Sequence, residues 1–192
     1  MMNINRFHHR KTIRLKGYDY SQSGFYYVTV CTQNRECLLG EIIDRKMVLN
    51  EIGEIVDDIL NSLPNRYEQI KLDIYQIMPN HVHTIIQIVG AHHDAPIMHH
   101  DTSVYKRAIH ESPLQKRSLL SRIIGYFKMN SAKLIHQINP NIPVWQRNYE
   151  VYPEGSRRKH IIRNENELNA IRQYIIDNPK NWAKDENNPN LI

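Results

Sequence analysis

Two apolar runs separated only by a tight turn constrain the fold of this 192-residue chain more than any other feature. The runs cover residues 71–78 and 82–89, and Pro79-Asn80 forms the predicted turn between them. Strands joined by so short a connection pair in antiparallel fashion, because parallel strands need a long crossover. We therefore predict a β-hairpin within an antiparallel sheet.

Two histidines, His81 and His83, lie where the second of these runs begins. Residues i and i+2 of a strand point to one face, so both imidazoles can be directed at a single point. This is the minimum geometry for a divalent metal site. Burying two polar rings without partners would cost free energy, which favours a partner or a ligand for them. The alternative, which the pair alone leaves open, is a structural or surface role.

The other elements are predicted from aromatic and β-branched runs, from helical periodicity and from capping residues. We expect strands at 24–32 and 37–43, paired through Gln33-Asn34-Arg35, and helices at about 51–63, 118–137 and 165–177. The expected N-caps are Asn50 and Asn164, and the expected ends are Pro64 and Asn178-Pro179. This order predicts an α+β fold: a ferredoxin-like antiparallel sheet with helices packed on one face.

Length and composition suit one domain over residues 1–192. Residues 1–23 are expected to form a basic arm, and 90–117 and 150–159 to form loops. Lys and Arg together number 25 against 20 for Asp and Glu, and the resulting charge of +5 favours a polyanionic partner. The two cysteines are too few for a disulfide scaffold, and the N-terminal stretch lacks the apolar segment of a signal peptide. We expect a soluble cytoplasmic protein.

Tyr174 and Asn178 are four residues apart on the last predicted helix, so they share one helix face. A tyrosine at such a position can simply cover the apolar stripe of the helix. Asn178, directly before a proline, can simply cap the helix. This helix alone therefore does not indicate a function.

Several motifs occur in a fixed order along the chain, and together they indicate a family. They are Met78-Pro79-Asn80-His81-Val82-His83, Val144-Trp145-Gln146-Arg147-Asn148-Tyr149, His160-Ile161-Ile162-Arg163-Asn164 and Tyr174-Ile175-Ile176-Asp177-Asn178-Pro179. With them the chain, from about Arg14 to Trp182, resembles the single-tyrosine HUH transposases, and most closely the REP-associated tyrosine transposase branch. The resemblance implies the HUH endonuclease fold.

The resemblance also implies an activity and its residues. In such enzymes a tyrosine hydroxyl attacks a phosphodiester of single-stranded DNA, forms a 5′-phosphotyrosine and releases a 3′-hydroxyl; strand joining is the reverse step. By position, Tyr174 is the nucleophile, His81 and His83 are metal ligands, and Asn178 is the third ligand. A phenol, with a pKa of about 10, needs activation at neutral pH, and a divalent metal polarises the scissile phosphate. Two imidazoles and an amide oxygen suit Mg²⁺ or Mn²⁺, and Zn²⁺ stays open.

The substrate implied by the resemblance is hairpin DNA from palindromic repeats with an adjacent single strand. Lys and Arg can neutralise phosphates, and Trp can stack on a base. The candidate DNA-binding residues are Arg117, Arg122, Lys128, Trp145, Arg147, Arg157, Arg158 and Arg163. One departure from the family is the basic segment 151–159, which stands between two motifs that normally follow one another closely. Because relatives act as monomers or as dimers, either state is expected here.

Three alternatives remain at this point. The first is a non-catalytic hairpin-DNA-binding protein derived from a transposase, although such a protein would be expected to lose His81, His83 or Tyr174. The second is a metal-dependent phosphodiesterase that uses water and leaves Tyr174 idle. The third is an RNA-binding module, which would need Phe25, Tyr26 and Tyr27 exposed on the sheet for base stacking.

Overall fold

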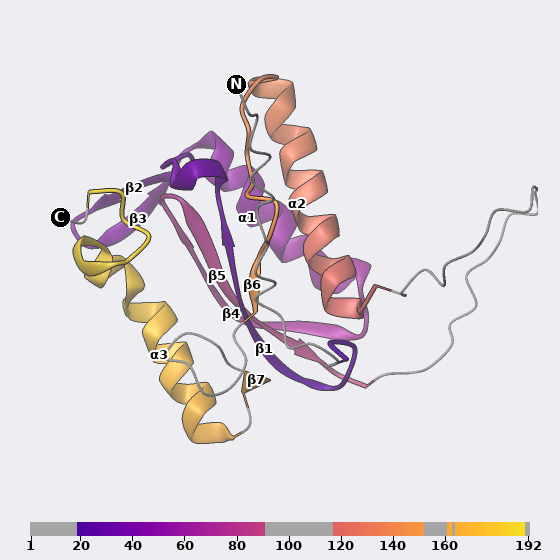
Figure 1. Cartoon of the computed structure of the whole chain (residues 1–192). Coiled ribbons are helices and arrows are strands. Elements are labelled where there is room, and N and C mark those ends of the chain that lie inside the picture. The colour runs from indigo at the N-terminus through magenta and orange to yellow at the C-terminus, as the bar shows by residue number, and fades with distance from the viewer. Residues whose placement is uncertain (1–18, 91–116, 152–160, 163, 191–192) are drawn as a thin grey trace, which may run out of the picture.

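The computed structural model describes residues 19–90, 117–151, 161–162 and 164–190. Their centre is an antiparallel sheet in the order β4-β5-β1-β6, with β7 also paired to β1 (Figure 1). Its strands are β1 (Gly24–Cys31), β4 (Ile70–Met78), β5 (His81–Ile88), β6 (Glu150–Val151) and β7 (Ile161–Ile162). The predicted hairpin is confirmed, because β4 and β5 pair antiparallel on either side of Pro79-Asn80.

Helices cover both faces of this sheet. Helices α1 (Glu51–Arg66) and α2 (Leu119–Ile138) lie on one face, and α3 (Glu165–Asn181) lies on the other (Figure 1). The predicted α+β class is confirmed, but the expectation that all helices share one face is wrong. The physical reason is that β1 and β5 carry apolar side chains toward both faces, with Tyr27 and Ile85 on the face that α3 covers, so both faces need cover.

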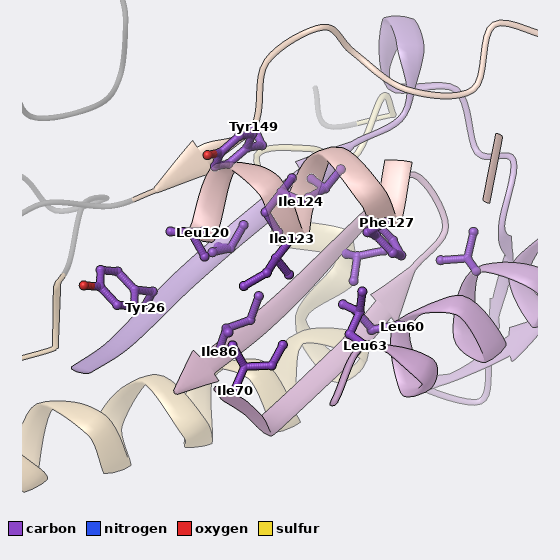
Figure 2. Close-up of a cluster of buried hydrophobic side chains, with 14 of the residues drawn as sticks. Tyr26, Leu60, Leu63, Ile70, Ile86, Leu120, Ile123, Ile124, Phe127 and Tyr149 are labelled. Carbon is purple, nitrogen blue, oxygen red and sulfur yellow. The ribbon is translucent and has the colours of Figure 1, made fainter. Parts of the chain in front are cut away.

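Alternate residues of β1 pack into two separate hydrophobic cores, one on each face of the sheet. Tyr26, Val28 and Val30 belong to the larger core, which the sheet forms with α1 and α2 (Figure 2). Tyr27 faces the other way, into a smaller core built with Ile85 and α3. Because Tyr26 and Tyr27 are both buried, β1 offers no row of exposed aromatics, and the RNA-binding alternative loses its main support.

One predicted strand pairing is wrong. Residues 37–43 do not pair with β1; β2 (Gly40–Ile43) forms a separate two-stranded sheet with β3 (Lys46–Leu49). The reason is that both edges of β1 are already occupied, one by β5 and the other by β6 and β7. The intervening Asn34 and Arg35 adopt left-handed backbone angles, φ 54° and 58°, which redirect the chain away from β1.

The helix starts are as predicted, with Asn50 and Asn164 as the predicted caps and Ser118 as a further one, but two predicted ends are wrong. Asn50, Ser118 and Asn164 each accept a hydrogen bond from the backbone N–H three residues on. Helix α1 continues past Pro64 to Arg66, and α3 continues past Pro179 to Asn181. A proline removes one N–H, but its fixed φ is helical, so a packed helix can run through it. As a result Asn178 lies inside α3 and is buried instead of capping its end.

No helix among the described residues is both long enough and apolar enough to cross a membrane.

Two helical glycines provide a matched test of the packing around α1. A Cβ added to Gly53 in α1 would lie 2.1 Å from the backbone oxygen of Leu39, whereas one added to Gly125 in α2 would meet nothing within 4 Å. We expect Gly53→Ala to lower the free energy of unfolding by about 1–3 kcal/mol through overpacking. Gly125→Ala should raise it by roughly 0.5–1 kcal/mol through better helix propensity. Urea denaturation of both variants checks this, and equal effects of the two would contradict the packing of α1.

Candidate active site

The two predicted histidines meet on the sheet face that α3 covers. His81 and His83 are 0% and 1% exposed, and their Nε2 atoms are 3.0 Å apart. The expected arrangement of two imidazoles on one strand face, directed at one point, is therefore confirmed. Two buried nitrogen atoms so close together need a shared proton or a cation between them, because facing lone pairs repel.

Strand β1 supplies the polar partners of His83. Antiparallel register places Thr29 opposite His83, and both the Thr29 Oγ1 and the Tyr27 hydroxyl lie 2.8 Å from His83 Nδ1. A hydroxyl can donate or accept, so His83 Nδ1 finds a partner whether or not it carries a proton. The ring can therefore leave its Nε2 lone pair free for a ligand without losing a hydrogen bond.

Burial keeps both histidines uncharged. It lowers the pKa of His83 to about 3 from an ordinary 6.5. Burial likewise holds the pKa of His81 well below its usual value, with smaller contributions from His83 and the Arg35 guanidinium. At neutral pH both rings are therefore in the form that binds metal ions.

Helix α3 brings Tyr174 and Asn178 to the same place. The Tyr174 ring lies edge-on to the rings of His83 and Tyr27, with centroids 5.6 and 6.4 Å away. Burial raises the pKa of the Tyr174 phenol, while interactions with the side chains of Asn178 and Tyr27 lower it in part. One turn further on, Asn178 is buried, and its Oδ1 has no hydrogen-bond partner. An unpaired buried amide oxygen costs free energy, so it favours a ligand at this position.

Asp185 also lies at this site, and the sequence motifs did not indicate it. It follows the short 3₁₀ turn η2 (Trp182–Lys184), is buried, and has its Oδ2 4.0 Å from His81 Nε2. Burial raises the pKa of its carboxyl, and hydrogen bonds from Asn187 oppose this. The one signal for Asp185 in the sequence is its place as an acidic residue shortly after the last helix. That signal is weak, because helical periodicity does not predict the path of the chain beyond the end of a helix.

These side chains meet three criteria for a site that can bind a divalent metal. One ligand atom each from His81, His83 and Asp185 lies within 4.8 Å of the others, and the orphaned Asn178 Oδ1 adds an amide oxygen. Two imidazole nitrogens with carboxylate and amide oxygens match the preferences of Mn²⁺ and Zn²⁺, and the oxygens also suit Mg²⁺. The site is buried and carries an acid whose charge a cation would neutralise.

The predicted DNA-binding residues that the structure describes do not lie beside His81 and His83. Lys128 and Trp145 belong with α2 and the larger core, on the opposite face of the sheet. Lys128 donates to the backbone carbonyls of 146–148. The Trp145 indole donates to Ser131 Oγ at 2.9 Å and packs on the Phe127 ring at 5.4 Å. Both side chains therefore hold the 145–148 segment onto α2.

The arginines of the predicted set divide into two groups. Arg117, Arg122 and Arg147 are exposed, so they can contact a phosphate backbone. Arg157, Arg158 and Arg163 lie outside the described residues, as does most of the 151–159 segment.

The chain is similar in sequence to a known protein and in structure to two others. It is 34% identical to an uncharacterized protein of Haemophilus influenzae over 182 residues, which are 93% of each chain. The structure of a REP-associated tyrosine transposase bound to a REP hairpin is similar at a TM-score of 0.52 and 15% identity, over 88% of this chain and 73% of that one. A candidate transposase of Deinococcus radiodurans, 17% identical over 85% of this chain and 97% of that one, has a TM-score of 0.46, too low to add to the argument. No protein-family model matches the chain.

The fold predicted from the motifs is thereby confirmed, because the similarity to the REP-associated tyrosine transposase extends over most of the described elements.

The depressed pKa of His83 predicts acid sensitivity of the metal-free protein. In the unfolded chain the histidine takes up a proton below about pH 6.5, whereas folded His83 stays neutral down to about pH 3. The unfolded state therefore binds more protons than the folded state below pH 6.5. As the pH falls from 6.5 toward 3, this residue lowers the free energy of unfolding by about 1.4 kcal/mol per pH unit. We expect His83→Gln to flatten that slope by this amount in urea denaturation with a chelator present. An unaltered slope in His83→Gln would contradict the buried neutral ring.

Proposed function

This chain belongs to the same protein family as the Haemophilus influenzae protein and has the fold of a REP-associated tyrosine transposase, and we propose that it cleaves and rejoins single-stranded DNA through Tyr174. The observation that carries the proposal is the convergence on one sheet face of a histidine pair, a tyrosine and an unpaired buried amide oxygen. A non-catalytic DNA-binding protein would have no need to keep four such groups together.

Tyr174 is the proposed nucleophile. Its oxygen bonds to phosphorus and gives up the phenolic proton, while the 3′-oxygen of the broken strand leaves and takes up a proton. The product is a 5′-phosphotyrosine and a free 3′-hydroxyl, and strand joining reverses each step. The ring is half exposed, so DNA can reach it, although part of the side chain is buried beside His83. Because burial raises the phenol pKa, the hydroxyl is protonated at neutral pH and needs help to react.

His81, His83, Asn178 and Asp185 would hold a divalent metal, with Mn²⁺ or Mg²⁺ as the proposed ion. Bound there, the ion would polarise the scissile phosphate and stabilise charge on its non-bridging oxygens. The protein's own contribution is the burial of these side chains, which limits their contact with water. Within it the Tyr27 and Thr29 hydroxyls fix the orientation of the His83 ring.

We propose hairpin DNA with a flanking single strand as the substrate. The similarity to a transposase bound to a REP hairpin supports this choice, as does the net charge of +5. Arg117, Arg122 and Arg147 remain the described candidates for phosphate contacts, and Arg157, Arg158 and Arg163 are retained from the sequence. Lys128 and Trp145 also stay predictions for DNA contact, and their hydrogen bonds within the protein hold the 145–148 segment in place.

Removal of one hydroxyl tests the nucleophile. In Tyr174→Phe we expect adduct formation and cleavage to fall below detection, while affinity for the DNA stays within about threefold, because the ring and its packing are kept. The measurement is incubation with labelled single-stranded hairpin DNA and Mn²⁺, followed by a denaturing gel for a covalent protein–DNA species.

Tyr149→Phe is the matched control for this measurement. The same hydroxyl is lost, but Tyr149 belongs to the larger core on the opposite sheet face, where its hydroxyl lies 3.0 Å from Ser121 Oγ. This variant should form the adduct normally. Cleavage without an adduct in the wild type would instead indicate a phosphodiesterase that uses water, and binding without cleavage would indicate a DNA-binding protein.

The oxygen ligands are tested by direct metal binding. We expect Asn178→Ala and Asp185→Ala each to weaken Mn²⁺ binding by about tenfold or more, since each removes one donor from a small set. Isothermal titration of the DNA-free protein measures the affinity. Glu186→Ala removes the same charge one residue on at an exposed position and serves as the control. If Asp185→Ala binds as tightly as Glu186→Ala, the carboxylate is not a ligand.

A further inference from the structure

Asn80, at the turn between β4 and β5, connects three parts of the site through one side chain. It is completely buried. Its Oδ1 lies 2.9 Å from His81 Nδ1, and its Nδ2 donates to the backbone oxygens of Arg35 at 2.9 Å and Asn187 at 2.7 Å. Every polar atom of this amide thus has a partner, and the partners come from three separate segments.

The two carbonyl partners determine which way the amide faces. A backbone carbonyl can only accept a hydrogen bond, so the group facing Arg35 O and Asn187 O must be the NH₂ of Asn80. The amide oxygen therefore faces His81. Because that oxygen can only accept, His81 Nδ1 must carry the ring proton, and Nε2 is left with a lone pair directed toward His83.

The backbone of Asn80 is held equally firmly. Its carbonyl oxygen accepts hydrogen bonds from both the backbone N–H and the side-chain hydroxyl of Thr32, at 2.9 and 3.0 Å. Just before it, the Pro79 oxygen accepts from the Leu39 N–H at 3.0 Å. The side chain therefore starts from a fixed point and has little freedom to choose another rotamer.

The segment that carries Asp185 depends on the same amide. Asp185 Oδ1 accepts from the Asn187 N–H at 2.6 Å, and the Asn187 carbonyl is one of the two oxygens bound by Asn80. The Arg35 guanidinium provides a second attachment, because it donates a hydrogen bond to the backbone oxygen of Glu186 at 3.0 Å. The position of the carboxylate beside His81 is thus tied to the turn that also orients the His81 ring.

We propose that Asn80 is a positioning residue with two separable functions: its Oδ1 sets the tautomer of His81, and its Nδ2 anchors the segment 185–190 beside the histidine pair. Only the consequence of the first function for the reaction rests on the proposed metal-binding role of His81; the tautomer itself and the anchoring do not. Asn80 acts on the reaction only through these neighbours and does not contact the reacting atoms.

Asn80→Asp and Asn80→Ala separate the two functions. The Asp variant keeps an oxygen acceptor for His81 Nδ1 but loses the NH₂ donors, and the Ala variant loses both. Asn130→Ala is the matched control, because Asn130 lies on α2, where its amide donates to the Tyr126 oxygen. Two readouts in the metal-free protein at pH 8 are the imidazole ¹⁵N shifts of His81 and the hydrogen-exchange rates of the Asn187 and Asn188 amides. A third readout is Mn²⁺ affinity.

We expect wild-type protein and Asn80→Asp to show the Nδ1–H tautomer of His81, and Asn80→Ala to lose it. Exchange of the Asn187 and Asn188 amides should accelerate at least tenfold in both variants and not in Asn130→Ala. Mn²⁺ affinity should fall further in Asn80→Ala than in Asn80→Asp.

Two results would overturn the proposal. A wild-type His81 protonated on Nε2 would remove the first function, even if neither variant folds. Unchanged exchange in a folded Asn80→Asp would remove the second. Wild-type protein that binds no Mn²⁺ but shows the expected tautomer and exchange would instead refute the metal-dependent function and leave the positioning role supported.

Discussion

The antiparallel pairing of β1 with β5 is the interaction on which the rest of this structure depends. Each strand is buried on both faces, so the apolar residues along the ladder contribute to one of two cores, while Thr29 and His83 pair at the site. The even-numbered residues of both strands face α1 and α2, as Figure 2 shows for Tyr26 and Ile86, and the odd-numbered residues face α3. The same ladder sets the site, because its register brings Thr29 beside His83 and leaves His81 at the strand end next to the Asn80 turn.

Placing polar groups on a strand buried on both faces requires a partner for each. Hydroxyls from β1 serve His83, and the Asn80 amide serves His81. Asn178 Oδ1 is the exception on this face, since it has no partner at all. Satisfied groups surrounding one unsatisfied oxygen are the pattern expected of a site completed by a ligand, and the lowered pKa values of both histidines agree with a cation rather than a proton.

The site combines elements that differ in how firmly they are attached. The histidines lie on a central strand, whereas Tyr174 and Asn178 lie on a helix that packs on that strand through its own small core. The bidentate ion pair between Arg172 and Asp73, with both N–O distances at 2.7 Å, adds a lateral attachment of α3 to β4. Asp185 is further still along the chain, and contacts of Arg35 and Asn80 with the backbone keep it close.

Local patterns in the sequence determined the hairpin, the helix starts and the shared face of His81 and His83, because strand and helix periodicity and capping act over a few residues. They also predicted Tyr174 and Asn178 as neighbours on one helix face. Only the tertiary structure decided that residues 37–43 do not pair with β1, that α3 covers the second sheet face, and that Asp185 joins the histidines. Each of these depends on which strand edge or apolar face is already occupied by a distant segment, and that competition cannot be evaluated from a local window of residues.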